Sequence, residues 1–270
     1  MIALEMVGLT SLRQLLAVLC LCVLTTAAWA QQPTPTVPPL VAAEEEDPTK
    51  PIFFSLRNEY RNLLADSWAN TTIIRVDRLS FRGLKNGGGL GGLLLRLDVP
   101  INAVHRDPVT KFGLGDIYGQ ALYLPYARRN LALAVGAGIV LPTATDDLLG
   151  QGKLIIAPTV IPVWYIERRQ RFAFVRIQNY FSVAGKSHRS AVNYFVADPT
   201  LVHRLSRRWW VTLDNEFRWD WRTSRGSGIA GLQLGRMVQR KFGFWIKPEI
   251  PWGPGRTGDV NLKFTVFRIR

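Results

Sequence analysis

Hydrophobic and polar residues alternate along much of the chain, most strongly in residues 209–221, "WWVTLDNEFRWDW". Every second position from Trp209 is mostly apolar, whereas the positions between them carry Thr212, Asp214, Glu216, Arg218 and Asp220. Because successive side chains of a β-strand point to opposite faces, this pattern predicts a strand with one apolar and one strongly polar face. Such a strand fits a soluble sandwich with its polar face in bulk water. It also fits a barrel whose apolar face meets lipid and whose polar face meets a wet interior.

The rest of residues 52–270 has the same character. It contains no apolar run of the ~18 residues or more that mark a membrane-spanning helix. Short segments rich in aliphatic and aromatic residues are instead separated by turn signals, which is typical of an all-β chain. The candidate strands are 52–64, 71–82, 93–104, 114–126, 131–142, 153–166, 171–184, 191–203, 208–221, 228–238, 242–252 and 258–269. This even number would bring both ends of a barrel to the same side of a membrane.

Charged residues repeatedly share the face opposite the large apolar ones. In 93–104 they oppose leucines, and in 242–252 they oppose Phe, Ile and Trp. We therefore predict that they line a water-filled lumen: Arg96, Asp98, Asp214, Glu216, Arg218, Asp220, Lys247 and Glu249. Tryptophans at the two ends of the 208–221 strand are expected in the aromatic girdles of a membrane barrel.

Four prolines fall inside predicted strands: Pro158, Pro162, Pro199 and Pro248. Each removes a ladder hydrogen bond, and a closed barrel has no edge strand to hold it. We therefore expect these prolines at bulges or at strand ends.

The segments between the strands are of two kinds that alternate along the chain. Short basic turns occupy 126–130, 167–171, 205–208 and 238–241, with the Gly-rich segment 85–92 in the place of one more. Longer loops rich in Gly, Pro, Ser and Asp occupy 104–113, 142–152, 184–190, 222–228 and 252–258. Short turns on one side and longer loops on the other are the layout of an outer-membrane barrel. The predicted fold is thus all-β, an antiparallel transmembrane β-barrel of about 12 strands over residues 52–270.

The N-terminal residues 1–30 are predicted to be a signal peptide. Arg13 precedes an apolar stretch that ends at Ala28-Trp29-Ala30, a small-x-small cleavage pattern. An uncleaved anchor stays an alternative, because Glu5 weakens the positive charge of the leader. Residues 31–51, rich in Pro, Thr and Glu, are predicted to be a flexible linker. A signal peptide together with a barrel predicts location in the cell outer membrane.

Residues 112–164 resemble an outer-membrane barrel family named after the meta-pathway of phenol degradation. The resemblance is carried by "FGLGDI" (112–117) and "LALAVGAGIVLPTATDDLLGQGK" (131–153), which match a Gly-Leu-Gly-Asp element, a Gly-alternating strand and a Pro-Thr-Gly loop. The chain has Ala144 where the family usually has Gly, and it ends in "VFRIR" where such barrels commonly end in an aromatic residue. The resemblance implies a pore-like or transport-associated protein, and it offers no established chemistry that could be assigned to individual residues.

Candidate chemistry is sparse. Both cysteines, Cys20 and Cys22, lie in the predicted signal peptide, so the mature chain has no thiol. No His/Asp/Glu cluster has metal-ligand spacing, and we predict neither a metal site nor a cofactor. Ser187 and Ser190 flank His188, which is the arrangement a hydrolase could use, although polar neighbours are expected in a loop.

The net charge of +14 does not indicate nucleic acid. The basic residues concentrate in turns and form no stripe along one element, so anionic headgroups of outer-membrane lipids are the expected partner.

The sequence predicts a channel or transport-associated barrel that passes a small polar or aromatic solute through its charged lumen. Two alternatives stay open. The charges could pair as a plug in a closed structural barrel, for example Arg96 with Asp98 or Glu216 with Arg218. The barrel could also be an outer-membrane lipid hydrolase that uses His188.

Overall fold

The computed structural model describes residues 52–82, 91–127, 130–166 and 171–269. The predicted signal peptide and linker therefore lie outside the described residues, as does most of the Gly-rich segment 85–92. Within the described ranges, regular structure consists of β-strands, and no helix is long and apolar enough to cross a membrane.

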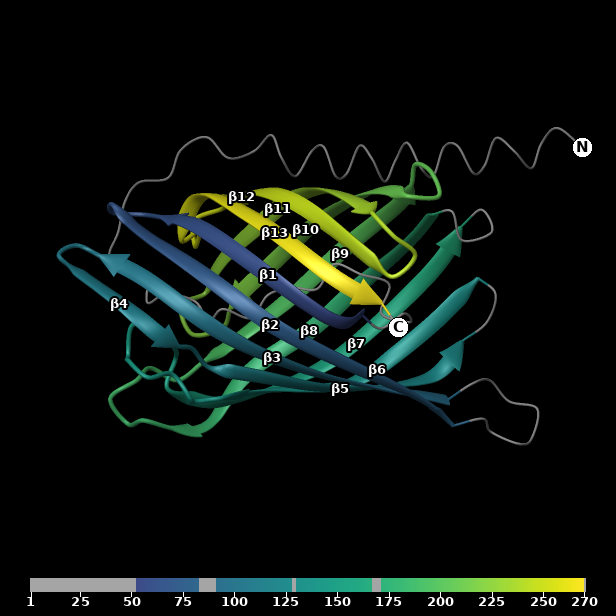
Figure 1. The fold of residues 1–270 in the computed structure, drawn as a ribbon. Helices are drawn as coiled ribbons and strands as arrows, with labels where there is room; N and C mark the ends of the chain where they lie inside the picture. Colours follow the sequence, from purple (N-terminus) through teal and green to yellow (C-terminus); the bar gives the residue numbers. More distant parts are fainter. Residues whose placement is uncertain (1–51, 83–90, 128–129, 167–170, 270) are drawn as a thin grey trace, which may run out of the picture. The chain divides into compact units, whose positions relative to one another are not determined.

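Thirteen strands make up most of the described chain (Figure 1). They are β1 Ile52–Leu63, β2 Ser67–Arg82, β3 Gly91–Arg106, β4 Val109–Leu114, β5 Ile117–Ala127, β6 Leu131–Leu141, β7 Lys153–Ile166, β8 Arg171–Gly185, β9 Asn193–Arg204, β10 Trp209–Asp220, β11 Arg225–Met237, β12 Phe242–Trp252 and β13 Gly258–Ile269.

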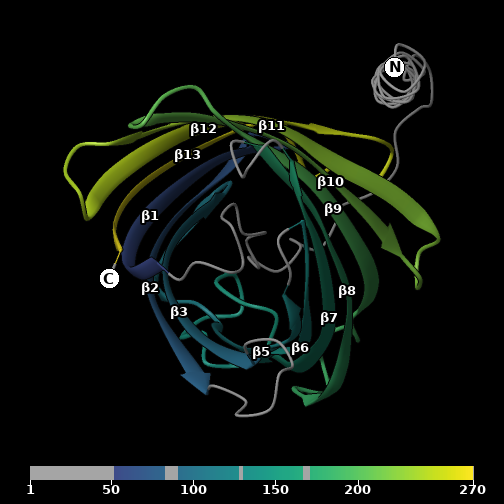
Figure 2. The same ribbon diagram turned by 90° about the vertical axis from the view of Figure 1, so that its right-hand side faces the viewer.

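The strands form one closed antiparallel barrel. Apart from β4 and β5, strands that follow each other in sequence pair with each other, and β1 pairs with β13 to close the ring (Figure 2). Both β4 and β5 pair with β3, β4 along Ile101–Arg106 and β5 along Gly92–Asp98, so the two share one place in the ring. The barrel therefore has twelve strand positions, and the fold predicted from the period-two pattern is confirmed.

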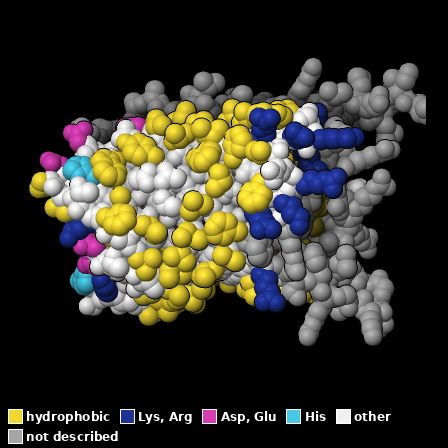
Figure 3. Space-filling model, in the orientation of Figure 1, with side chains coloured by type: hydrophobic (Ala, Val, Ile, Leu, Met, Phe, Trp, Pro, Cys, Tyr) yellow, Lys and Arg dark blue, Asp and Glu magenta, His cyan; other side chains and the backbone are white. Residues whose placement is uncertain are grey.

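The two faces of the strands differ as the alternation predicts. On β10 the Leu213 side chain is 45% exposed, whereas its neighbour Thr212 is fully buried. The exposed face carries large apolar side chains from strands all around the ring, and they form a broad apolar band on the outer surface (Figure 3). The opposite face points into the barrel.

The two ends of the barrel differ. At the end that we call the turn end, β1 begins beside the end of β13, with Ile52 opposite Ile269, and short turns such as 205–208 connect the strands. At the opposite end, the loop end, lie the longer connections 142–152, 186–192 and 253–257. Both ends of the barrel segment thus lie on one side, as the even strand number predicts.

Two of the predicted loops are strand hairpins instead. The predicted loop 104–113 is the tip of a hairpin, because β3 continues to Arg106, β4 starts at Val109, and His105 pairs with Thr110. The predicted loop 222–228 likewise belongs mostly to β11, which starts at Arg225. In both hairpins the ladder pairing continues into polar and glycine residues, so the apolar pattern alone ends the strands too early.

The expectation for the four strand prolines is wrong. Pro158, Pro162, Pro199 and Pro248 lie inside continuous strands, and the residues on either side of each keep the same register. An antiparallel residue directs its N–H toward one neighbouring strand only, so a proline removes a bond on one side and leaves the other ladder in place. All four are on the outward face, where they expose no unpaired N–H.

Candidate functional site: the charged barrel interior

The inner face of the barrel holds all eight side chains predicted to line a lumen. Each lies on the strand face opposite the exposed apolar residues. Four of them are buried in the wall, namely Asp98, Asp214, Lys247 and Glu249, and the other four are partly exposed. The strands β3, β10 and β12 position them, because the period of two directs every second side chain inward.

Four charges on β2 and β3 form two ion pairs across the ladder. The register places Arg75 opposite Asp98 and Asp77 opposite Arg96. Arg75 donates to Asp98 with an Nε–Oδ1 distance of 2.7 Å and an Nη2–Oδ2 distance of 2.6 Å. Arg96 donates to Asp77 at 2.8 Å and 3.0 Å, and also to Gln120 on β5 at 3.3 Å.

This arrangement corrects the suggested pairing of Arg96 with Asp98. Residues two apart on one strand are ~7 Å apart along the backbone, whereas residues opposite each other across an antiparallel ladder have Cβ atoms ~4.5–5.5 Å apart. The sequence Arg-x-Asp occurs on both strands in antiparallel order, so each arginine meets the aspartate of the other strand.

A second charge network spans β10, β12 and β13. The Lys247 Nζ atom lies 2.6 Å from Asp214 Oδ2 and 2.9 Å from Glu249 Oε1. Glu249 is also 2.7 Å from the Nζ atom of Lys263, which stands opposite Lys247 on β13. The Glu249 carboxylate therefore separates two lysines that face each other, and its negative charge offsets their repulsion.

The remaining predicted residues of β10 behave differently from one another. The Arg218 guanidinium lies 3.6 Å from the centroid of the Tyr194 ring. Asp220 caps the turn at the end of the strand by accepting bonds from the backbone N–H groups of Arg222 and Thr223. Glu216 has no hydrogen bond or ion pair with any described residue. The suggested pairing of Glu216 with Arg218 is therefore wrong, because the arginine stacks on the tyrosine of the neighbouring strand.

The structure adds inward charges that the sequence analysis did not select. Arg57 and Glu59 on β1 are 2.8 Å apart, and Arg176 on β8 lies 3.5 Å from Asp198 on β9. Arg75, Asp77 and Lys263 complete the set. These inward charges stand two residues apart in the sequence, which is the signal that could have identified them. On β2, however, apolar residues such as the buried Ile73 also point inward, and they obscure the alternation of polar and apolar residues.

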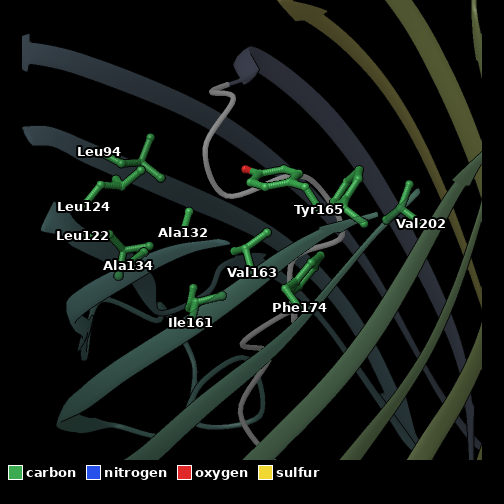
Figure 4. Close-up of a cluster of buried hydrophobic side chains, with 11 residues drawn as sticks. Leu94, Leu122, Leu124, Ala132, Ala134, Ile161, Val163, Tyr165, Phe174 and Val202 are labelled. Atoms are coloured by element: carbon green, nitrogen blue, oxygen red, sulfur yellow. The ribbon is translucent and has the colours of Figure 1, made fainter. Parts of the chain in front are cut away.

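Part of the inner wall is apolar, which the sequence analysis did not anticipate. A cluster of buried apolar side chains lies on the inner face of β3 and β5–β9 (Figure 4), with Phe172 and Phe174 stacked 6.3 Å apart. A second cluster contains Tyr180 and Tyr194, whose ring centroids are 4.7 Å apart. The sequence indicated this apolar wall at 131–141, where the inward positions carry no charge and are Ala and Gly except for Val140.

The loop 142–152 folds against the inner wall at the loop end. Its Leu149 is 1% exposed and packs on Leu63, Ala69 and Val104, which are inward residues of β1, β2 and β3. Asn102 donates a hydrogen bond to the Leu149 carbonyl at 2.7 Å. This segment, which was predicted to be a loop, therefore extends from β6 and β7 to β1, β2 and β3, and it narrows the interior at the loop end.

Asp116, in the gap between β4 and β5, holds both ends of this loop. Its Oδ1 accepts the backbone N–H of Ala144 at 3.1 Å and its Oδ2 accepts that of Gln151 at 2.5 Å. Thr143 adds a bond from the Ile117 N–H to its hydroxyl and a bond from its hydroxyl to the Gly115 carbonyl. The Gly-Leu-Gly-Asp element therefore has a structural role, in which its aspartate fixes the inward loop.

The neighbouring loop 186–192 holds the same segment from outside. Arg189 donates to the carbonyls of Gly150 and Gln151. Lys186 and His188 both contact the Asp147 carboxylate, at 2.6 Å and 2.9 Å. The hydrogen bond from Lys186, followed by that from His188, lowers the pKa of Asp147 to about 2.

This geometry does not support the suggested use of His188 by a hydrolase. The His188 ring contacts Asp147, but no hydrogen bond joins it to Ser187 or Ser190 in the described part of the chain. A serine nucleophile needs a base within hydrogen-bond reach. Among the described residues, no group of three or more His, Cys, Asp and Glu is placed to hold a metal ion.

Comparisons with known proteins give the fold and no closer relationship. No family model matches the sequence, and no curated protein matches it either. The barrel is similar to the COG4313 outer membrane channel from Pseudomonas putida F1, with a TM-score of 0.67 and 10% identity over 84% of this chain and 100% of that one. It is also similar to the KdgM porin, alone and in complex with disordered oligogalacturonate, with a TM-score of 0.52 and 9% identity over 80% of this chain and 98% of the porin.

These likenesses establish that the chain has the fold of outer-membrane β-barrel channels and porins. The resemblance of residues 112–164 to the family named after phenol degradation stays a prediction. The chain is a closed twelve-stranded antiparallel barrel with an outer-membrane channel fold.

Proposed function

We propose that this protein is an outer-membrane channel that passes small solutes through its charged lumen. The observation that carries the proposal is the closed barrel with an apolar outer band and an inner wall rich in charge. A protein that faces water on its outside would not expose large apolar side chains around the whole ring. A membrane barrel exposes them to lipid and keeps its polar residues inside.

The solute path in this proposal follows the charged side chains of the inner wall. Its predicted lining residues are Arg96, Asp98, Asp214, Glu216, Arg218, Asp220, Lys247 and Glu249. Glu216 and Arg218 are the members most directly available to a solute, because both are partly exposed and neither forms an ion pair with a described residue. Asp98, Lys247 and Glu249 instead hold the wall in shape through their ion pairs.

Reconstitution of the full chain into planar bilayers tests the channel. Wild type should give discrete conductance steps. Glu216→Gln should shift the selectivity toward anions, and Arg218→Gln on the same face should shift it toward cations, because fixed charge near the path sets which ions enter. Equal selectivity in both variants would contradict the assigned path. Asp259→Asn, at an exposed position of the loop end, is the control and should leave selectivity unchanged.

A closed structural barrel is the second candidate, and the pairing of the inner charges favours it. If it is correct, wild type stays silent in the bilayer. Breaking one buried pair by Asp98→Ala would then open a leak, because the remaining arginine loses its partner. Conductance of the wild-type protein would contradict the closed barrel and support the channel.

A further inference from the structure

Basic side chains surround the turn end of the outer surface from β9 to β13. Figure 3 shows Lys and Arg gathered along the right-hand border of the apolar band. None of the set forms an ion pair with a described residue. Its members are Arg207, Arg208, Arg236, Arg240, Lys241 and Arg268.

Two of these arginines alternate with aromatic residues on neighbouring strands near the turn end. The register places Arg236 between Trp209 on β10 and Phe244 on β12. The Arg236 guanidinium lies 4.9 Å from the centroid of the Trp209 ring.

Arg268 on β13 repeats the arrangement. It stands between Phe242 on β12 and Phe54 on β1, and its guanidinium lies 5.8 Å from the centroid of the Phe242 ring. Both phenylalanines are exposed, at 49% and 42%. The outer surface therefore carries a row in which aromatic residues and arginines follow each other across five strands.

The position of this row at the border of the apolar band indicates which part of the membrane surrounds it. Exposed aromatic rings at the border of an apolar band sit at the level of the lipid headgroups. A guanidinium offers a planar fork of donors that matches the oxygens of a phosphate. Stacking on an aromatic ring leaves the edge of the guanidinium directed away from the ring face, where these donors lie.

We propose that Arg236 and Arg268 each bind the phosphate of an anionic phospholipid in the membrane leaflet that surrounds the turn end. The proposal rests on the membrane insertion that is part of the proposed function, and it does not depend on conductance. The two arginines are two strands apart, ~10 Å across the sheet, so each takes a separate headgroup phosphate. The other basic residues of the turn end add the general attraction of a positive surface for anionic lipid.

Thermal unfolding in vesicles tests the proposal. The full chain is folded into phosphatidylcholine vesicles, and into vesicles that also contain phosphatidylglycerol, and its Tm is followed by the gel-mobility change on heating. Phosphatidylglycerol should raise the Tm of wild type by several degrees, because a ligand that binds only the folded state stabilises it. Arg236→Gln combined with Arg268→Gln should lose most of this rise.

A matched pair at the loop end is the control. Arg222→Gln combined with Arg225→Gln removes two exposed arginines, so the charge of the chain falls equally, and the rise in Tm should remain. Equal loss in both double variants would overturn the site in favour of nonspecific charge. Inorganic phosphate added to phosphatidylcholine vesicles should leave the Tm unchanged. An equal rise would assign the arginines to free phosphate.

The Tm in phosphatidylcholine vesicles, which contain no anionic lipid, distinguishes an effect of a variant on folding from an effect on lipid binding. The Gln variants should unfold in phosphatidylcholine at the wild-type Tm. If they fail to fold, Arg236→Lys combined with Arg268→Lys keeps the charge but removes the planar fork, and this pair should lose about half of the rise. A full rise in the Lys variant would overturn the bidentate site. Failure of wild type to insert at all would contradict the membrane location itself.

Discussion

Lys247 on β12 and Asp214 on β10 form an ion pair across the intervening strand β11, with 2.6 Å between Nζ and Oδ2. The residue between them is Gly231, which stands opposite Asp214 in one ladder and opposite Glu249 in the other. A Cβ atom at this position would lie 2.6 Å from Asp214 Oδ1 and 2.8 Å from Lys247 Cε. The absence of a side chain at position 231 therefore lets two strands that are not neighbours share an ion pair.

Gly231→Ala should displace the two charged side chains and destabilise the barrel. We expect a loss of ~1–3 kcal/mol in the free energy of unfolding, because an added methyl group in a packed wall forces its neighbours aside. Urea unfolding in vesicles measures this loss. Gly119→Ala is the matched control, because its Cβ would make only an ordinary 3.4 Å contact with Ile139. Equal losses at the two glycines would show that the ion pair does not depend on Gly231.

Leu213→Arg should destabilise the inserted barrel by ~2–4 kcal/mol if the site lies near the bilayer midplane, because it places a charge in lipid. Glu216→Arg introduces the same side chain on the same strand, but on the inner face that already carries charge. It should cost clearly less. The comparison is made by unfolding the two variants in the same vesicles. A larger cost at position 216 would mean that the inner and outer faces of β10 are assigned wrongly.

Asp116→Ala should loosen the inward loop 142–152 while the barrel stays folded. The backbone N–H groups of Ala144 and Gln151 lose their acceptors, and each lost bond to a charged group is worth ~1.5–3 kcal/mol. Hydrogen exchange of the loop amides should become faster. If the loop narrows the solute path, conductance should also rise.

Asp259→Ala is the control for this loop. It removes an exposed aspartate whose partner is the exposed Arg256, so it should change neither readout. Unchanged loop exchange in Asp116→Ala would contradict the role given to Asp116.

Acid should release the contact between the two loops only at low pH. The pKa of Asp147 is lowered to about 2, so its ionised form is favoured by folding. The resulting stabilisation is fully present above the ordinary carboxyl pKa of ~3.9 and is lost as the pH falls through about 2. Hydrogen exchange of loop 142–152, corrected for the intrinsic rate, should therefore rise between pH 4 and pH 2.

Asp147→Asn provides the comparison for this acid effect. It removes the titrating carboxylate, so its loop exchange should be faster than wild type at neutral pH and should lack the rise on acidification. The same rise in the variant would assign the acid effect to another carboxylate. Asp146, which is also in the loop and has a lowered pKa, is the first candidate.

The sequence by itself determined the class of fold and the direction of the charged side chains. A period of two is a local property of the chain, and it holds for each strand separately. Every second residue from Thr212 to Asp220 could therefore be assigned to the inner face without knowledge of any partner strand. The twelve strand positions followed from the turn signals, although the chain uses two strands, β4 and β5, for one position.

Only the tertiary structure decided which charges pair. Asp98 accepts its hydrogen bonds from Arg75, because the register of β2 on β3 sets the residue opposite it. Lys247 reaches Asp214 because a third strand presents a glycine between them. The inward position of loop 142–152 depends on contacts with strands that are distant in sequence, such as that of Leu149 with Leu63. These relationships join segments far apart in the chain, and no local alternation of residue types records them.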